Sequence, residues 1–310
     1  MSRYPADSYC AALRCAVLLA FAFAVAGCRE QPTGPGAERE QPSAPPERVV
    51  SFAPNITETV FALGQGRRLV GVSSFCDYPP EVRALRPVGG HINPDLEAVA
   101  VLKPDLILLQ GRHEKVAQFA AHNNVPVAHV NMDSLDTVDE GIQTIGNALG
   151  CPERAEALRA RIRSELDAVR NATAGRPRPR VLIITTRQSH DLNNLYTVGG
   201  RSFVSELVEV AGGDNIYRDA AQPYIEASKE TIVMRAPEVV LEFHAGEDLS
   251  QDEIRRYQDD WRQLASLPAV QNGRIHLILE SHALRPGPRM PEIARLIAAI
   301  LHPDALQAAP

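Results

Sequence analysis

Two stretches with the same pattern, DLEAVAVLKPDLIL at residues 95–108 and SKETIVMRAPEVVL at residues 228–241, decide the fold. Each starts with a good helix-capping residue, continues in a short helical pattern, and reaches a proline that precedes an apolar strand. The two stretches are 133 residues apart, and the expected opening strands at Val49 and Val181 are 132 apart. This repeat indicates that each half of the chain is one structural unit. The alternative is chance similarity, because the segments between these anchors do not keep register.

Around the repeat, apolar runs alternate with helical patterns, which predicts α/β layers with largely parallel strands. In the first half, the expected strands and helices lie at 48–52, 56–63, 69–72, 96–102, 105–109, 113–122 and 126–130. In the second half, they lie at 181–185, 203–210, 229–235, 239–243, 275–279 and 291–301.

A long helical segment lies between the halves. Residues 134–174 are expected to be helical, with one interruption at Cys151 and Pro152. The second part has apolar residues at spacings of four, four and three, which are typical of one buried helix face: Leu158, Ile162, Leu166 and Val169. A helix over Glu153–Thr173 has a length of about 30 Å, which is enough to span a small lobe.

The resulting fold class is α/β, with two similar α/β lobes joined by one long rigid α-helix. We expect an N-terminal lobe at 47–132, a helical linker at 133–175 that includes this helix, and a C-terminal lobe at 176–310. Small ligands bind preferentially where lobes meet, so the sequence predicts a ligand cleft between them.

The N-terminus resembles a bacterial lipoprotein signal peptide, which we place at residues 1–27. Two arginines precede an apolar run of eleven residues. That run is too short to cross a bilayer, which needs about 20 residues. It ends in Val-Ala-Gly before Cys28, so we expect Cys28 to be lipidated, although an ordinary signal peptide with an incidental cysteine is the alternative. Arg29 follows, which favours the outer membrane, and residues 28–46 are expected to form a disordered, proline-rich tether.

Composition and motifs exclude several classes of protein. A net charge of −6 argues against a nucleic-acid partner. The chain has no Gly-x-Ser-x-Gly, phosphate loop or metalloprotease motif, so we expect no enzyme, with a catalytic envelope protein as the distant alternative. Cys76 and Cys151 allow one disulfide, but nothing in the sequence brings them together, so two unpaired thiols are favoured.

Several motifs resemble those of the periplasmic binding proteins of cobalamin importers, within a wider helical-backbone group that serves cobalamin, haem and iron-siderophore importers. They are RVVSFAPNITETVFALG at 48–64, VGVSSFCDYPP at 70–80, LKPDLIL at 102–108, AGGDNI at 211–216 and PAVQNGR at 268–274. The resemblance implies two lobes, a single rigid connecting helix, a ligand held between the lobes, and docking on a membrane permease.

The same resemblance implies a function. The protein is expected to be a lipid-anchored solute-binding component of an ABC importer, located in the periplasm or cell envelope. A cobalamin-like corrinoid is the first expected ligand, and haem or a ferric siderophore is the alternative. The expected partners are the permease and ATPase, with membrane contact through the lipid anchor only. The chain is expected to be a monomer that needs no cofactor.

Candidate ligand contacts follow from the resemblance. In the cobalamin-binding group, aromatic residues at the positions matching Phe75, His91, Tyr196 and Tyr224 pack on the corrin, and Arg285 completes our candidate set. Phe75 and Tyr196 fit the lobe core as an alternative. Two positions depart from the group, because His91 stands in place of a tryptophan and Leu284 lies where an acidic residue would be expected.

Two glutamates are candidate docking residues. Glu97 and Glu230 each lie seven residues before the proline of the repeat. In the cobalamin-binding group, a glutamate at this place on each lobe forms a salt bridge with the permease. The alternative is that each carboxylate only favours the dipole of its helix.

Five of the nine histidines follow expected strand ends: His91, His113, His190, His244 and His282. Open α/β sheets bind ligands beyond these ends. The pattern allows axial ligation of haem iron or cobalt, or a bare metal site, or simply exposed loop histidines. His91 is the candidate axial ligand.

Overall fold

The computed structural model describes residues 44–90 and 92–305. The predictions for the signal peptide, for the lipidated Cys28, for most of the tether and for His91 lie outside the described residues. None of the helices in the described part of the chain is both long and apolar enough to cross a membrane.

The first lobe contains a five-stranded parallel sheet with the order β3-β2-β1-β4-β5. Its strands are β1 (Val49–Ser51), β2 (Leu69–Val72), β3 (Arg86–Pro87), β4 (Leu106–Gln110) and β5 (Val127–Val130). Its helices are α1 (Pro54–Ala62), α2 (Leu96–Leu102) and α3 (Glu114–His122), with short 3-10 turns at Gly66–Arg68 and Pro80–Ala84. Residues 49–51 of β1 and 106–109 of β4 are buried and, apart from Ser51, apolar, as parallel strands covered on both faces usually are.

The second lobe contains a four-stranded parallel sheet with the order β11-β10-β6-β8. These strands are β6 (Arg180–Ile184), β8 (Asp214–Asn215), β10 (Val239–Phe243) and β11 (Ile275–Ile278). A separate antiparallel pair is formed by β7 (Leu195–Val198) and β9 (Tyr224–Ala227). The helices are α6 (Phe203–Val210), α7 (Lys229–Arg235), α8 (Gln251–Asp260), α9 (Pro268–Gln271) and α10 (Met290–Leu301), with a 3-10 turn at Trp261–Leu264.

The repeat in the sequence is also a repeat in the structure. Val49 of β1 lies opposite Leu106 of β4, and Val181 of β6 lies opposite Val239 of β10. These two pairs are related by the 132- and 133-residue offsets, so the halves share strand order and register. Chance similarity is therefore excluded as the explanation of the pattern.

The helix in each repeat begins and ends in the same way. The side chains of Asp95 and Ser228 cap α2 and α7 by accepting backbone N–H groups three residues later, at 2.9 and 3.2 Å. Lys103 and Ala236 end the helices in the left-handed conformation, with φ of 46° and 41°. This turn lets the following proline start the next strand, because proline cannot continue the helix.

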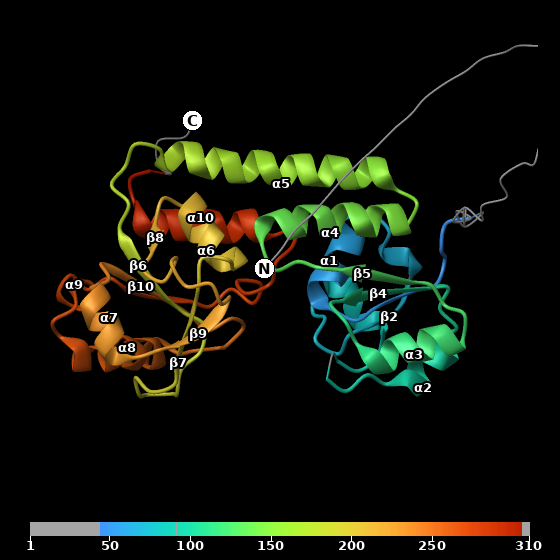
Figure 1. The fold of residues 1–310 in the computed structure, drawn as a ribbon, viewed down its shortest axis with the longest axis horizontal. Coiled ribbons are helices and arrows are strands. Elements are labelled where there is room, and N and C mark those ends of the chain that lie inside the picture. The colour runs from blue at the N-terminus through green and yellow to red at the C-terminus, as the bar shows by residue number, and fades with distance from the viewer. Residues whose placement is uncertain (1–43, 91, 306–310) are drawn as a thin grey trace, which may run out of the picture. The chain divides into compact units, whose positions relative to one another are not determined.

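The two lobes are connected through α4 (Leu135–Ala148) and α5 (Pro152–Thr173). Figure 1 shows α5 running along one side of both lobes, with α4 and α10 in the row beneath it. At 1.5 Å per residue, the 22 residues of α5 extend about 33 Å. A Cβ placed on Gly146 of α4 would collide with Ala155, so a glycine is needed where α4 and α5 approach most closely.

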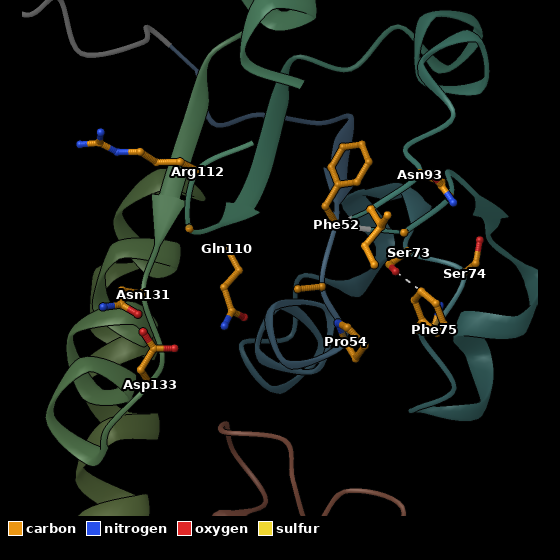
Figure 2. Close-up of a pocket in the computed structure, with 15 residues that line it drawn as sticks. Phe52, Pro54, Ser73, Ser74, Phe75, Asn93, Gln110, Arg112, Asn131 and Asp133 are labelled. Atoms are coloured by element: carbon orange, nitrogen blue, oxygen red, sulfur yellow. Dashed lines mark hydrogen bonds between the residues drawn. The ribbon is translucent and has the colours of Figure 1, made fainter. Parts of the chain in front are cut away.

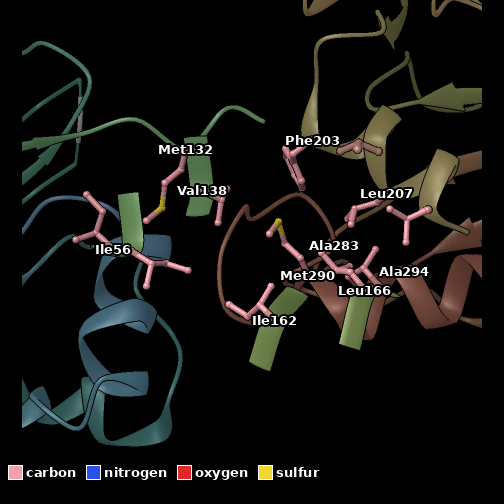
Figure 3. Packing of buried hydrophobic residues seen from close by; sticks show 14 of the residues in the cluster. Ile56, Met132, Val138, Ile162, Leu166, Phe203, Leu207, Ala283, Met290 and Ala294 are labelled. Carbon is pink, nitrogen blue, oxygen red and sulfur yellow. The ribbon is translucent and has the colours of Figure 1, made fainter. Parts of the chain in front are cut away.

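One hydrophobic core runs through the connection. It extends from Ile56 in the first lobe, through Val138 of α4 and Ile162 of α5, to Leu207 and Met290 in the second lobe (Figure 3). Two hydrogen bonds reinforce this junction: Phe203 N–H donates to the Asp133 carbonyl at 2.9 Å, and Leu135 N–H donates to the Glu206 carboxylate at 2.5 Å. The predicted fold class, two α/β lobes joined by a long helix, is confirmed.

Cys76 and Cys151 are both free thiols, as the sequence favoured. Cys76 lies 3.2 Å from the Thr57 hydroxyl, and burial raises the pKa of its thiol to about 11. It is therefore a protonated, unreactive thiol at neutral pH.

Candidate ligand-binding site

The carboxyl ends of the strands in the first lobe open onto a cavity of about 850 Å³ (Figure 2). Such a volume lies within the range of about 300–1,000 Å³ that is usual for small-molecule sites. Each strand contributes the residues that follow it, and the cavity is lined by Phe52, Ala53, Pro54, Ser73, Ser74, Phe75, Gly89, Gly90, Ile92, Asn93, Gln110, Gly111, Arg112, Asn131 and Asp133.

The lining is mainly apolar and uncharged. Figure 2 places Gln110, Asn131 and Asp133 on one side of the cavity and Phe52 and Phe75 on the other. Arg112 is the one cation and Asp133 the one anion in the described lining. This surface suits a large ligand with an apolar face and neutral polar groups at its edge.

Phe75, which the family resemblance suggests as a ligand contact, lines this cavity. Its backbone N–H donates to the Ser73 hydroxyl at 3.4 Å, and a Cβ on Gly90 would lie 2.5 Å from its ring. Gly90 therefore leaves space for the ring at the wall. The side chain is 69% exposed, so the alternative reading of Phe75 as lobe core is wrong.

Tyr196 and Tyr224 lie in the second lobe, on β7 and β9. The antiparallel register pairs Tyr196 with Glu226 and Val198 with Tyr224, so the two tyrosines share one face of the pair. Both rings are exposed, which also excludes the core reading for Tyr196. Desolvation and the negative charge of Asp133 raise the pKa of Tyr224. Neither tyrosine is among the residues that line the cavity of the first lobe.

Arg285 lies in a group of charges that joins the two lobes. Together with Arg289 it pairs with Glu58 and Asp77 of the first lobe, and we call these four residues the lobe clasp. Arg289 donates to Glu58 at 2.8 and 2.6 Å, and Arg285 donates to Asp77 at 3.0 Å. The hydrogen bond from Arg285 lowers the pKa of Asp77.

The clasp is partly buried, because only 4% of the Glu58 side chain is exposed. The guanidinium of Arg289 also stacks over the ring of Tyr78 at 4.0 Å. In this arrangement Arg285 is fully engaged by protein carboxylates. The clasp could not be predicted from the sequence, because its two arginines lie more than 200 residues after its two carboxylates.

The second lobe carries a buried charge cluster at its strand ends, formed by Arg187, Glu242, His244, Tyr257 and Trp261. Glu242 accepts hydrogen bonds from Arg187 at 2.6 Å, from Trp261 Nε1 at 2.9 Å and from His244 Nε2 at 2.9 Å. The side chains of Arg187 and Glu242 are each 1% exposed. The sequence analysis missed this cluster, although a glutamate within the buried strand VVLEF of β10 is a readable signal.

Arg187 also organises the loop after β6. It donates to the Asp191 carbonyl at 2.9 Å and to the Tyr257 carbonyl at 3.1 Å, and its guanidinium lies 4.8 Å from the Tyr257 ring centre. A polar cavity of about 110 Å³ lies among these groups, which is too small for a large ligand. The cluster therefore holds the loops of the second lobe in place.

The four described histidines after strand ends do not meet at one site. His113 caps α3 by accepting the Val116 N–H at 3.4 Å, and His190 stacks on Tyr257 at 4.9 Å. His244 lies between Glu242 and Glu247. His282 lies 3.1 Å from Glu292. Over residues 44–90 and 92–305, no group of three His, Cys, Asp or Glu side chains is placed to hold a metal ion.

Glu97 and Glu230 occupy the first turns of α2 and α7 and are exposed. Neither forms an ion pair with another residue in the described part of the chain. Hydrogen bonds from its own backbone N–H and from the Ser228 hydroxyl lower the pKa of Glu230. Both carboxylates are thus available to an external cation.

Comparison with known proteins places the chain among binding proteins. Residues 49–280 match the sequence profile of the periplasmic binding protein family. The vitamin B12-binding protein of Pectobacterium carotovorum is 27% identical over 258 residues, which cover 83% of this chain and 88% of that protein. A curated relative from Vibrio parahaemolyticus, also named vitamin B12-binding protein, is 28% identical over 79% of this chain and 86% of its own length.

Two of the solved structures with the same fold are named for different ligands. The periplasmic vitamin B12-binding protein of Vibrio cholerae superposes with a TM-score of 0.69 and 26% identity, covering 85% of this chain and 99% of that one. The apo periplasmic haem-binding protein of Roseiflexus sp. RS-1 superposes with a TM-score of 0.69 and 28% identity, covering 84% and 99%.

Proposed function

Because this chain belongs to the periplasmic binding protein family, we propose that it is the solute-binding component of an ABC importer for a cobalamin-like corrinoid. It captures the corrinoid and delivers it to the permease. It performs no catalysis and needs no cofactor. The similarity to vitamin B12-binding proteins over most of the chain supports this assignment.

The cavity at the strand ends of the first lobe is the observation that carries the proposal. A corrinoid is large and has an apolar macrocycle edged by neutral amides. Phe52 and Phe75 offer aromatic surface to the macrocycle, and Gln110 and Asn131 offer hydrogen-bond partners to amides. Haem carries two carboxylates instead, and Arg112 is the single cation of the described lining to meet them.

The proposed contacts come from both lobes. Phe75 contributes from the first lobe, and Tyr196 and Tyr224 contribute from the shared face of β7 and β9. Arg285 is a further proposed contact. In this structure, its guanidinium is paired with the carboxylates of Asp77 and Glu58. His91 is proposed as a packing residue or axial ligand of the bound metal. If His91→Ala abolishes the shift of the cobalt or Soret absorption band that binding causes in the wild type, axial ligation by His91 is supported. If the spectrum of the bound variant is the same as that of the wild type, His91 is not an axial ligand.

Haem or a ferric siderophore is the second candidate ligand. The observation in its favour is the haem-binding structure, which is as similar in fold and identity as the B12-binding one. In that case histidine ligation at His91 becomes the mechanism of recognition.

The proposed location is the periplasm, with the chain anchored by lipid at Cys28 in the outer membrane and connected by the tether at 28–46. Family membership supports the periplasm, and the sequence of the first 28 residues supports the anchor. The proposed partners are the permease and ATPase, and the protein acts as a monomer.

Delivery to the permease is proposed to use Glu97 and Glu230. The two carboxylates are exposed at matched places on the two lobes and have no cation partner in the described structure. Each pairs with an arginine of the permease. We expect Glu97→Ala with Glu230→Ala to abolish uptake without changing ligand affinity. Glu153→Ala is the matched control, because Glu153 is also an exposed acid in a first helical turn. Unchanged uptake in the double variant would contradict docking.

Ligand identity is tested by titrating the chain from Arg29 onward with cyanocobalamin, cobinamide, haemin and ferric siderophores. Calorimetry and visible spectra report binding. We expect saturable corrinoid binding with one site per chain. Haemin binding with a shifted Soret band and no corrinoid binding would transfer the assignment to haem, and a failure of all ligands would contradict both.

A further inference from the structure

The helices of the repeat expose matched apolar side chains as well as matched glutamates. Val101 of α2 and Met234 of α7 are 69% and 74% exposed, and they are 133 residues apart. Each lies four residues after its glutamate, so Glu97 with Val101 and Glu230 with Met234 share one helix face. The inner face is matched too, because Val99 and Ile232 are both fully buried.

This arrangement differs from ordinary scattered surface apolar residues, which need no explanation. The same pair of a carboxylate and an apolar side chain stands at the same place on each lobe. The residues immediately before them, Ala100 and Val233, are exposed as well, so each apolar surface extends around the helix. Folding does not require either surface, since neither side chain contributes to the core.

Two arginines beside these surfaces are engaged within the protein. Arg235 donates to Asp219 at 2.9 Å, and Arg48 donates to the Leu102 carbonyl at 2.9 Å. Lys229 lies next to Glu230 and Lys103 follows α2, but neither glutamate forms an ion pair in the described part of the chain, so both carboxylates are available beside the apolar side chains. The matching partner is one that presents a cation next to an apolar surface, and presents it twice.

We propose that Val101 and Met234, together with Glu97 and Glu230, form a two-part docking surface for the paired membrane subunits of the ABC importer. This inference rests on the docking role proposed above and adds an apolar contact to it. Apolar contact around each ion pair excludes water, and such pairs interact more strongly than solvated ones. Met234 buries more surface than Val101, so the second lobe makes the larger apolar contact.

The apolar and charged parts differ in their dependence on salt. Exposed charges are screened within about 3 Å at 1 M salt, whereas apolar burial is not weakened by added salt in this way. Removing the glutamates therefore weakens docking at low salt and much less at 1 M salt. Removing the apolar side chains weakens docking by a similar factor at both.

The experiment uses the mature chain and the cobalamin permease–ATPase complex of the same bacterium, reconstituted in lipid nanodiscs. Docking affinity is measured at 0.05 and 1 M salt for wild type, for Val101→Thr with Met234→Gln, and for Glu97→Gln with Glu230→Gln. Ala157→Gln on the exposed face of α5 is the control for an added polar side chain. The substitutions in the two double variants keep side-chain size close to the original, and all the substituted sites are exposed.

We expect the apolar double variant to dock at least about tenfold more weakly at both salt concentrations, with unchanged ligand affinity and thermal stability, and Ala157→Gln to dock like wild type. Of the single variants, Met234→Gln is expected to lose more than Val101→Thr. Full docking by the apolar double variant, while the glutamine variant is weakened, would overturn this inference and leave the proposed docking role intact.

Two other results would overturn the inference. Failure of the wild-type chain to dock would remove the docking role as well. If sedimentation shows that the wild-type chain self-associates and that the apolar double variant does not, the surface binds a second copy of the chain instead.

Discussion

The two lobes share a scaffold but differ at the carboxyl ends of their strands. In both, two central parallel strands pair in the same register, and a seven-residue helix precedes the second of them. The first lobe opens there onto a cavity of about 850 Å³ with a largely uncharged lining. The second lobe closes the same place with buried charges. Position 109 is a buried leucine in the first lobe, and its equivalent at 242 is a buried glutamate.

The two halves of the repeat therefore share their scaffold and differ at their strand ends. The strand register, the helix caps and the exposed glutamates are common to both halves. The strand ends diverge, because the first lobe provides space for a ligand while the second uses Glu242 and Arg187 to fix its loops. Substitutions on either side of this division therefore should have different consequences.

Converting the second lobe toward the first should be strongly destabilising. Glu242→Leu copies the residue at position 109 but removes the fully buried carboxylate that pairs with Arg187, and only the more exposed Asp260 carboxylate remains beside the guanidinium. Breaking a buried pair costs about 3–5 kcal/mol, so we expect a loss of this size in the free energy of unfolding, measured with urea. The double variant Arg187→Met with Glu242→Leu should recover most of the loss. A single variant that unfolds like wild type would show that the cluster does not hold the lobe.

The lobe clasp should have the next largest effect. Glu58→Gln removes the carboxylate that two arginines share, and hydrogen bonds to charged groups are worth about 1.5–3 kcal/mol. We expect a loss within this range in urea unfolding. Glu156→Gln is the control, because its ion pairs with Arg159 and Arg163 are exposed and should contribute less than about 1 kcal/mol. Equal losses in the two variants would contradict a special role for the clasp.

Ligand binding should depend on aromatic contacts from both lobes. Phe75→Ala removes an exposed ring from the cavity wall of the first lobe, and we expect roughly tenfold weaker corrinoid binding by calorimetry. Tyr224→Ala tests the second lobe and should weaken binding by less, because Tyr224 lies outside the cavity lining. A larger loss for Tyr224→Ala would mean that the second lobe provides the main contact.

The charge cluster should also give the second lobe a small pH dependence. Burial opposes protonation of His244, but hydrogen bonds to Glu242 and Glu247 raise the pKa of His244 above its usual 6.5. Because the pKa of His244 is higher in the folded state, its protonation stabilises the folded protein at pH below 6.5. This stabilisation is lost as pH rises through the folded-state pKa of His244.

We expect the stability difference between wild type and His244→Gln to shrink as pH rises from 6 to 9. The difference is the informative quantity, because burial lowers the pKa of His276 and His302 and gives them the opposite slope. A difference that stays constant with pH would rule out a contribution from His244 protonation.

Much of the scaffold can be predicted from the sequence because its periodicity is local. The elements at 69–72, 96–102, 203–210 and 239–243 have the predicted bounds. The antiparallel pair β7 and β9 was not predicted, since its strands are short and pair across more than 20 intervening residues.

Less of the candidate site could be predicted from the sequence. Phe75 was found through a family pattern, whereas Gln110, Asn131 and Asp133 were missed. Gln110 ends β4, whereas Asn131 and Asp133 follow β5, so no short spacing along the chain links Gln110 to the other two. Their common position becomes visible only when the order of the parallel strands is known.

The structure of the chain with bound cyanocobalamin would show whether the first lobe supplies the main ligand wall. We expect the corrin macrocycle to lie against Phe75, with its amides near Gln110 and Asn131. A ligand seated on the Arg187 and Glu242 side of the second lobe, with the cavity of the first lobe empty, would contradict it.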